Sequence, residues 1–269
     1  MIAAMYKRQT LRPPVTFKEF NQVAHFFTRR FHPASPVSYG TTLTLGNTGV
    51  AATEYLTRYF SLTDRLYDEQ DQLLLNTPEA LETLRLLLDA RPCVQPSYSN
   101  WWRETAKAFA AGDTAMTVLF SNYASEITGL STKIASDIGT TFVPGGNPLM
   151  GGGSIGVCRY SQNKKEALNF IRWFCSEEIA SAMTYLGSAS PCQATYDNYQ
   201  IIDLYPWLAL TKESMTASHV KRWPQRQGDG FNERKLLNIM GLQIMHAING
   251  FVEPATAVQN MKKEMERII

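Results

Sequence analysis

The sequence contains no long apolar run. No stretch of the 269-residue chain reaches the roughly 18 consecutive apolar residues that indicate a membrane-spanning helix. Met1–Arg12 contains neither an apolar core nor a small-residue cleavage site, so we expect no signal peptide there. Two locations follow: the protein is cytoplasmic, or it is an exported protein whose N-terminal part has been removed.

The sequence also lacks an excess of charge of either sign. It has 26 basic and 24 acidic residues, a formal net charge of +2, and 19% charged residues in all. This balance gives no electrostatic reason to expect binding to nucleic acid or to an anionic membrane. With 44% hydrophobic residues, the chain is long enough to form one large domain or two small ones.

Cysteine is scarce, and its spacing argues against a zinc site. The chain has four cysteines and no CxxC pair. Cys158 and Cys175 have apolar neighbours, which favours buried thiols over disulfides or reactive thiols. Four free thiols fit a reducing compartment slightly better than an oxidising one.

The motifs of common enzyme classes are missing as well. The chain has no GxxxxGK[ST] phosphate loop, no HExxH metal motif and no GxSxG nucleophile motif. Its four histidines are scattered, and the acidic cluster at 64–71 is best interpreted as a solvated loop. We therefore expect no enzyme activity, no metal and no other cofactor.

Helix signals recur along the chain. Thr16 begins a capping box, and Thr77 followed by Pro78 is a second helix start. Helix ends are predicted at Gly112, Gly187 and Gly250. The spacing of apolar residues predicts helices over 16–30, 50–60, 77–88, 99–111, 164–174, 176–186, 233–249 and 254–269.

Strand signals alternate with these helices. Short β-branched or apolar runs bounded by turn residues predict strands over 1–6, 39–45, 114–120, 138–143 and 151–157. Such alternation favours a mostly parallel sheet with helices on its faces. The sequence thus predicts an α/β fold, with an irregular stretch over 190–207.

One aromatic residue is placed as a ligand contact would be. Tyr123 follows the predicted strand over 114–120, directly after Ser121 and Asn122. Ligands of open parallel sheets bind outside the carboxyl ends of the strands. An aromatic ring beside polar side chains suits a sugar, whose CH groups stack on the ring while its hydroxyls meet the polar groups. These three residues are therefore the first candidate site.

Five sequence patterns occur in a fixed order along nearly the whole chain. They are MYKR then PPVTFKEF at 5–20, FAAGDTAM at 109–116, PGGNP then GGGSIGV at 144–157, SQNKKEA through WF at 161–174, and GFVEP at 250–254. Together they resemble the patterns of bacterial extracellular solute-binding protein family 1, which includes maltose-binding protein.

The resemblance implies a periplasmic-binding-protein-like fold of type II, with two α/β lobes joined by hinge strands. Residues 1–157 and 205–269 would build the second lobe, and residues 158–204 would belong to the first lobe or bridge to it. Relatives carry further residues before the hinge strand that form most of the first lobe, so we expect that part to be missing here. An apolar face should then be exposed, or be covered by the missing lobe or a neighbouring chain.

The resemblance also implies ligand contacts on the second lobe. It places Tyr123 where relatives often have a stacking aromatic, and it places Asn47 and Thr48 in a loop that faces the cleft. A glycine replaces the tryptophan that many relatives carry in the cleft, which leaves the identity of the ligand open. The cleft-lining segment and the cleft mouth of relatives correspond here to Gly152, Gly153, Ser154 and Arg222.

The function implied is non-catalytic. The protein would capture a small solute, a mono- or oligosaccharide, by hinge closure and deliver it to the membrane permease of an ABC importer. It would be extracytoplasmic, either a membrane-anchored lipoprotein or a periplasmic protein. An alternative stays open: the same fold can serve as the effector-sensing domain of a cytoplasmic transcriptional regulator. This chain itself is not expected to bind nucleic acid.

Overall fold

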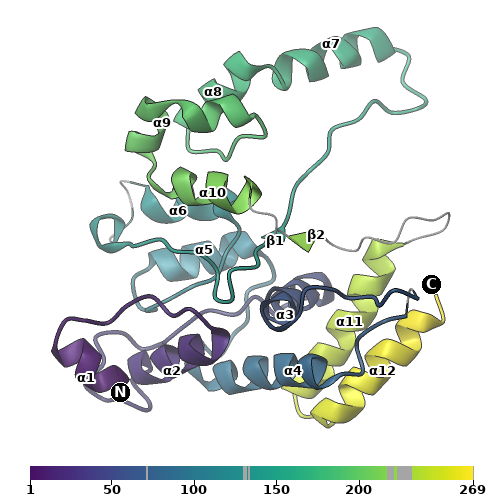
Figure 1. Cartoon of the computed structure of the whole chain (residues 1–269). Coiled ribbons are helices and arrows are strands. Elements are labelled where there is room, and N and C mark those ends of the chain that lie inside the picture. Colours follow the sequence, from purple (N-terminus) through teal and green to yellow (C-terminus); the bar gives the residue numbers. More distant parts are fainter. Residues whose placement is uncertain (71, 130–131, 133, 217–220, 223–231, 269) are drawn as a thin grey trace.

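The structure is a computed structural model that describes the whole chain except residues 71, 130–131, 133, 217–220, 223–231 and 269. It is mostly helical (Figure 1). The α-helices are α1 (Ile2–Lys7), α2 (Phe17–Phe27), α3 (Thr48–Leu62), α4 (Pro78–Ala90), α5 (Trp102–Ala110), α6 (Ala124–Thr128), α7 (Lys164–Phe174), α8 (Glu177–Tyr185), α9 (Tyr199–Leu204), α10 (Trp207–Thr216), α11 (Glu233–Ile248) and α12 (Pro254–Glu266). Short 3-10 helices lie between them: η1 (Arg91–Cys93), η2 (Ser121–Tyr123), η3 (Ala135–Asp137) and η4 (Gln193–Asp197). Within the described residues, no helix is both long and apolar enough to cross a bilayer.

Local capping signals set the helix ends, as the sequence predicts. The Thr16 hydroxyl accepts a hydrogen bond from the Glu19 amide at 3.1 Å at the start of α2. Thr77 caps α4 in the same way, with Pro78 at the first helical position. The glycines predicted to end helices adopt positive φ angles, which are 85° at Gly112, 92° at Gly187 and 77° at Gly250.

The main hydrophobic core joins α3, α4, α11 and α12. Figure 1 shows α11 and α12 side by side, with α3 and α4 against them. Met261 and Met265 of α12 are fully buried in this core. Helix α11 lies so close to α3 that a Cβ at Gly241 would be 1.9 Å from the carbonyl oxygen of Thr48. Glycine at this position therefore permits the helix contact that supports the start of α3.

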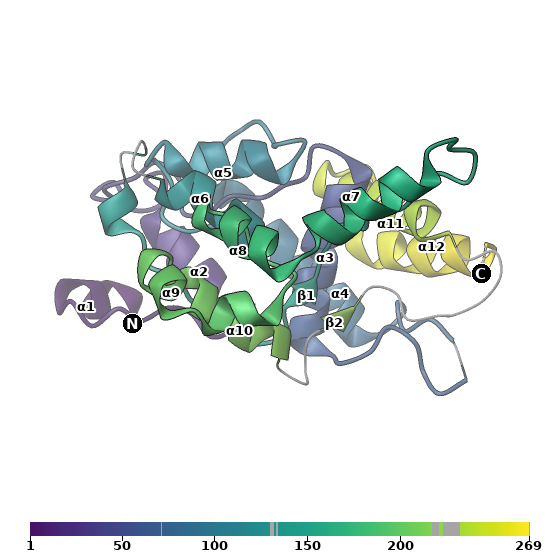
Figure 2. The ribbon, with the colours of Figure 1, turned by 90° about the horizontal axis from the view of Figure 1, so that it is seen from above.

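A second, smaller core forms between η4, α9 and α10. It consists of Tyr196, Ile201, Trp207 and Leu208. The irregular stretch predicted over 190–207 is wrong in part, because the Asn198 side chain caps α9 by accepting the Gln200 amide. Ala124 of α6 packs against this core, and Figure 2 shows α5 on the side of α6 that is away from α9 and α10.

Helix α7 leaves an apolar face exposed. None of its residues is buried, and Trp173 is 54% exposed. The other exposed apolar side chains of α7 and of the stretch before it are Ile155, Tyr160, Leu168, Phe170 and Phe174. Figure 1 shows α7 at the top of the molecule, away from α3, α4, α11 and α12. The predicted exposure of an apolar face is thus confirmed.

The predicted burial of two cysteines is wrong. Cys158 and Cys175 are exposed, because the stretch before α7 and the end of α7 pack against little else. Cys93, the last residue of η1, is buried, and burial raises the pKa of its thiol.

We expect a maleimide to label Cys158 and Cys175 rapidly in the folded chain and to leave Cys93 unmodified. The reagent needs an accessible thiolate, and Cys93 offers neither access nor a normal pKa. Peptide mass spectrometry after timed labelling measures each site, with urea-denatured chain as the control in which all cysteines react. Labelling of Cys93 at the rate of Cys158 would contradict the buried position.

The predicted strands mostly remain extended segments without a ladder. The described residues contain one two-stranded parallel sheet, β1 (Leu149–Met150) and β2 (Lys221–Arg222), with Leu149 opposite Lys221 and Met150 opposite Arg222. The backbones of segments 39–45 and 114–120 share one isolated bridge, Tyr39 to Thr114. Residues 138–143 and 151–157 are in no strand.

Segment 1–6 is another wrong strand, because it forms helix α1. Its alanines and methionines are good helix formers, and the described residues contain no strand paired with it. The α/β prediction is therefore right only in part. The helices form as expected, whereas the described sheet is far smaller than predicted.

Candidate ligand-binding site

Four aromatic rings cluster at the end of the extended segment 114–120. Tyr123 ends η2, and its hydroxyl accepts a hydrogen bond from the Trp101 indole N–H at 3.1 Å. Trp101 and Trp102 have ring centroids 4.5 Å apart, and Trp102 meets the Phe120 ring edge-to-face at 5.0 Å. Trp101 is 50% exposed while Tyr123 is half-buried. We call Trp101, Trp102, Phe120 and Tyr123 the aromatic cluster.

Helices α5 and α6 hold this cluster in place. Arg103 of α5 donates to the Glu126 carboxylate of α6 at 2.8 Å. The Glu104 carboxylate accepts the backbone N–H of Asn100 at 2.7 Å and so fixes the turn that presents Trp101. The indole orientation is therefore set from both sides, by the capped turn before α5 and by Tyr123.

The loop before α3 is bonded to the same turn. The amide of Gly46 donates to the Ser99 carbonyl at 2.9 Å, and a Cβ at Gly46 would be 2.5 Å from Asn100 Oδ1. Asn47 donates its side-chain amide to the Asn100 carbonyl, and its Oδ1 accepts the Val50 amide as the cap of α3. Asn47 thus bonds the residue that directly precedes Trp101, although Asn47 and Trp101 are far apart in sequence.

The glycine segment after β1 meets the cluster from another side. A Cβ at Gly151 would be 2.8 Å from the Phe120 ring, so the backbone passes close to one edge of that ring. Gly152, Gly153 and Ser154 are exposed, and a Cβ at either glycine would meet nothing. Their peptide groups are accessible beside the aromatic cluster.

The structure brings together some of the predicted site residues and separates others. Tyr123 and Asn47 bond residues of the turn at 99–102, and Gly151, which directly precedes Gly152, Gly153 and Ser154, lies against the Phe120 ring. Ser121 and Asn122 are exposed at the start of η2. Thr48 is directed away, because its hydroxyl donates to Asn238 Oδ1 of α11 at 2.8 Å. The backbone of Arg222 pairs with Met150, next to the glycine segment, and its side chain lies outside the described part.

Sequence reasoning missed the tryptophan pair. Trp101 and Trp102 are adjacent and directly precede a predicted helix, where one ring can pack while the other faces solvent. The contact with Tyr123 depends on how α5 packs on η2, which no local pattern encodes. The signal that could have indicated them is the pair of adjacent tryptophans at the start of a predicted helix.

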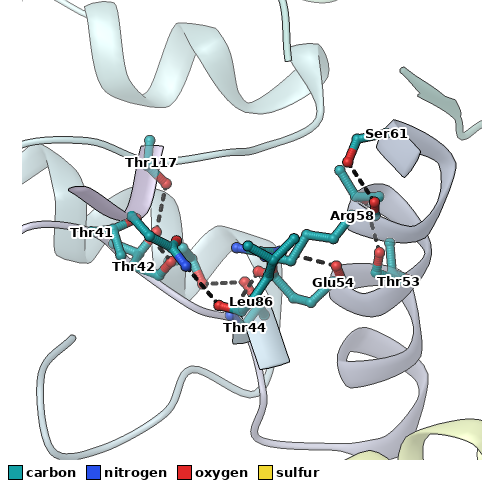
Figure 3. Close-up of polar contacts among 12 residues, drawn as sticks. Thr41, Thr42, Thr44, Thr53, Glu54, Arg58, Ser61, Leu86 and Thr117 are labelled. Carbon is teal, nitrogen blue, oxygen red and sulfur yellow. Dashed lines mark hydrogen bonds and ion pairs between the residues drawn. The ribbon is translucent and has the colours of Figure 1, made fainter. Parts of the chain in front are cut away.

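Glu54 and Arg58 of α3 form a buried ion pair (Figure 3). Arg58 of α3 donates to Glu54 at 2.6 Å, and the two side chains are 1% and 7% exposed. The other oxygen of the Glu54 carboxylate accepts the Thr44 amide at 2.9 Å. The described residues contain no group of three or more His, Cys, Asp or Glu side chains placed to hold a metal ion.

The model of one protein family, "Bacterial extracellular solute-binding protein", matches residues 2–200. The chain belongs to this family. A comparison with curated protein sequences finds no match.

Solved structures show that the fold is shared with such proteins. T. maritima MalE3 with bound maltose matches with a TM-score of 0.84 at 16% identity, over 100% of this chain and 69% of that one. A solute-binding protein from Agrobacterium radiobacter in complex with ribitol gives 0.79 at 18% identity, over 99% and 67%. A solute-binding protein from Agrobacterium vitis with bound D-mannitol gives 0.73 at 18% identity, over 99% and 68%.

These matches confirm the family resemblance and the coarse fold. The chain shares the fold of solute-binding proteins over about two thirds of their length, which is consistent with part of a type II fold. The assignment of residues to two lobes stays a prediction.

Proposed function

We propose that this family member binds a carbohydrate or polyol without catalysis and delivers it to an ABC-type permease. The observation that carries the proposal is the aromatic cluster: a half-exposed Trp101 is fixed by Tyr123 beside accessible polar groups. Rigid aromatic faces with a few placed polar groups suit ligands that carry CH and hydroxyl groups on opposite edges. The maltose, ribitol and D-mannitol complexes of structurally similar proteins support the same ligand class.

Each predicted residue then has a role. Trp101 and Tyr123 stack on the ligand, and the side chains of Asn47, Ser121 and Asn122 bond its hydroxyls. The exposed peptide groups of Gly152 and Gly153 let the ligand approach the backbone closely, with Ser154 beside them. Thr48 supports the loop through Asn238, and Arg222 lies at the margin of the site.

Capture would proceed by closure of two lobes. In this proposal residues 1–157 and 205–269 form the second lobe, and residues 158–204 contact the first lobe or a neighbouring chain. The exposed apolar face of α7 supports that arrangement, because a face of this kind is normally covered by a partner. An extracytoplasmic location follows from the same proposal, in agreement with the extracellular description of the family.

A thermal-shift screen of the two-lobed protein, with the first lobe present, against maltose, maltotriose, ribitol and D-mannitol tests the proposal. A ligand that binds only the native state raises the unfolding midpoint in proportion to the logarithm of its concentration above Kd. Polyols also stabilise proteins by exclusion from the surface, so glycerol at equal concentration is the control. Equal shifts from all five additives would contradict specific binding.

A further inference from the structure

The segment that leads into the Asn47 loop is held by separate backbone and side-chain bonds rather than by a sheet ladder. Residues 41–45 belong to no strand, and the Thr41 amide donates to the Cys93 carbonyl at 3.2 Å. The Thr44 amide donates to Glu54 Oε1 at 2.9 Å. Two hydroxyl pairs add support: Thr42 with Thr117 at 2.6 Å, and Thr44 with Thr105 at 2.8 Å. Figure 3 shows Thr42 bonded to Thr117, and Thr44 close to Glu54.

Glu54 uses its two carboxylate oxygens for different partners. One accepts the Thr44 amide, and the other is held by Arg58 Nη1 at 2.6 Å. Arg58 is fixed in turn, since Nη1 also donates to the Glu54 carbonyl at 3.0 Å and the guanidinium lies 4.6 Å from the centre of the Phe17 ring. A buried ion pair is weak evidence for stability, because apolar side chains of similar volume stabilise a core as well or better. Two apolar side chains in place of Glu54 and Arg58 could not accept the hydrogen bond from the Thr44 amide.

Thr44 is joined to the proposed ligand site by a short and rigid path. Gly46 follows Thr44 by two residues and packs closely on Asn100. A Cβ added at Gly46 would be 2.8 Å from the Cα of Asn100. Asn47 then bonds the Asn100 carbonyl, next to Trp101. A shift of segment 41–45 along its own axis would therefore displace both Asn47 and the turn that presents Trp101.

We propose that Glu54, held by Arg58, is a positioning residue for the ligand site. Its bond to the Thr44 amide fixes the placement of segment 41–47, and through it the placement of Asn47 and Trp101. The consequence for ligand binding rests on the proposed function, whereas the consequence for the segment does not.

Two double variants separate this bond from the charge pair. Glu54→Leu/Arg58→Met removes both charges and the acceptor for Thr44 while keeping apolar volume. Glu54→Gln/Arg58→Met also removes both charges, but its side-chain carbonyl can still accept the Thr44 amide. Backbone amide exchange of Thr44 by NMR reports on the segment. The Trp101 indole signal, identified with Trp101→Phe and titrated with maltose or D-mannitol, reports on the site.

We expect the Leu/Met variant to exchange the Thr44 amide at least about tenfold faster than the wild type. We also expect it to bind the probe at least about fivefold more weakly, whereas the Gln/Met variant stays within about twofold of the wild type in both measurements. Should the Leu/Met variant not unfold cooperatively, Glu54→Met/Arg58→Leu takes its place.

Two results would overturn the proposal. Wild-type exchange and affinity in both double variants would show that the bond positions nothing. Equal losses in both would assign the effect to the charge pair instead. If the two-lobed protein, with the first lobe present, binds none of the sugars or polyols, the proposed function fails, and the exchange comparison in this chain still decides the role of Glu54.

Discussion

Replacing Tyr123 with alanine is expected to weaken sugar or polyol binding at least about tenfold, or ~1.4 kcal/mol, while the chain stays folded. The substitution removes one stacking ring and also the hydroxyl that accepts the Trp101 indole N–H. Trp101, already half-exposed, would then be free to rotate, so two aromatic faces are lost by one change. Because Tyr123 is only half-buried, we expect the unfolding free energy to fall by about 1–2 kcal/mol at most.

Titration followed by the Trp101 indole resonance measures this loss, and circular dichroism checks the fold. Tyr123→Phe is the matched variant: it keeps the ring and removes only the hydroxyl, so it should shift the indole signal and reduce affinity less. Tyr199→Ala removes an exposed tyrosine of α9 and should leave binding unchanged. Wild-type affinity in Tyr123→Ala would rule out the aromatic cluster as the site.

Helix boundaries could be predicted from the sequence because their signals are local. Thr16 and Thr77 bond amides three residues away, and a glycine with positive φ ends a helix whatever surrounds it. Strands carry no such local determinant. Segment 41–45 is as β-branched as a strand should be, yet its Thr44 amide bonds a carboxylate of α3 instead of a neighbouring strand.

The candidate site was predictable to the same extent. Tyr123 could be found because it directly follows an apolar run, where a ligand contact is expected. Trp101 could not, since its exposure and its bond to Tyr123 depend on the packing of α5 against η2. The burial of Glu54 and Arg58 could not be predicted either. An i,i+4 pair of opposite charge is typical of a solvated helix face, and only the tertiary fold buries this one.

Burial of that pair gives the largest stability effect we expect from a single substitution. Arg58→Met should lower the unfolding free energy by about 3–5 kcal/mol, because it leaves the Glu54 carboxylate buried without its cation. It also removes the bond to the Glu54 carbonyl and the contact with the Phe17 ring. Urea unfolding followed by circular dichroism measures the change, provided that the m-value matches that of the wild type.

Arg85→Met is the control, since Arg85 and Glu82 form an exposed pair at 4.0 Å on α4. Its removal should change the unfolding free energy by no more than about 0.5 kcal/mol. An equally small effect for Arg58→Met would mean that water reaches Glu54. Near-wild-type stability of Glu54→Leu/Arg58→Met, beside a large loss in Arg58→Met, would instead assign the loss to the unpaired carboxylate. The pair would then contribute little to stability, and the Thr44 bond would be the reason a carboxylate is buried there.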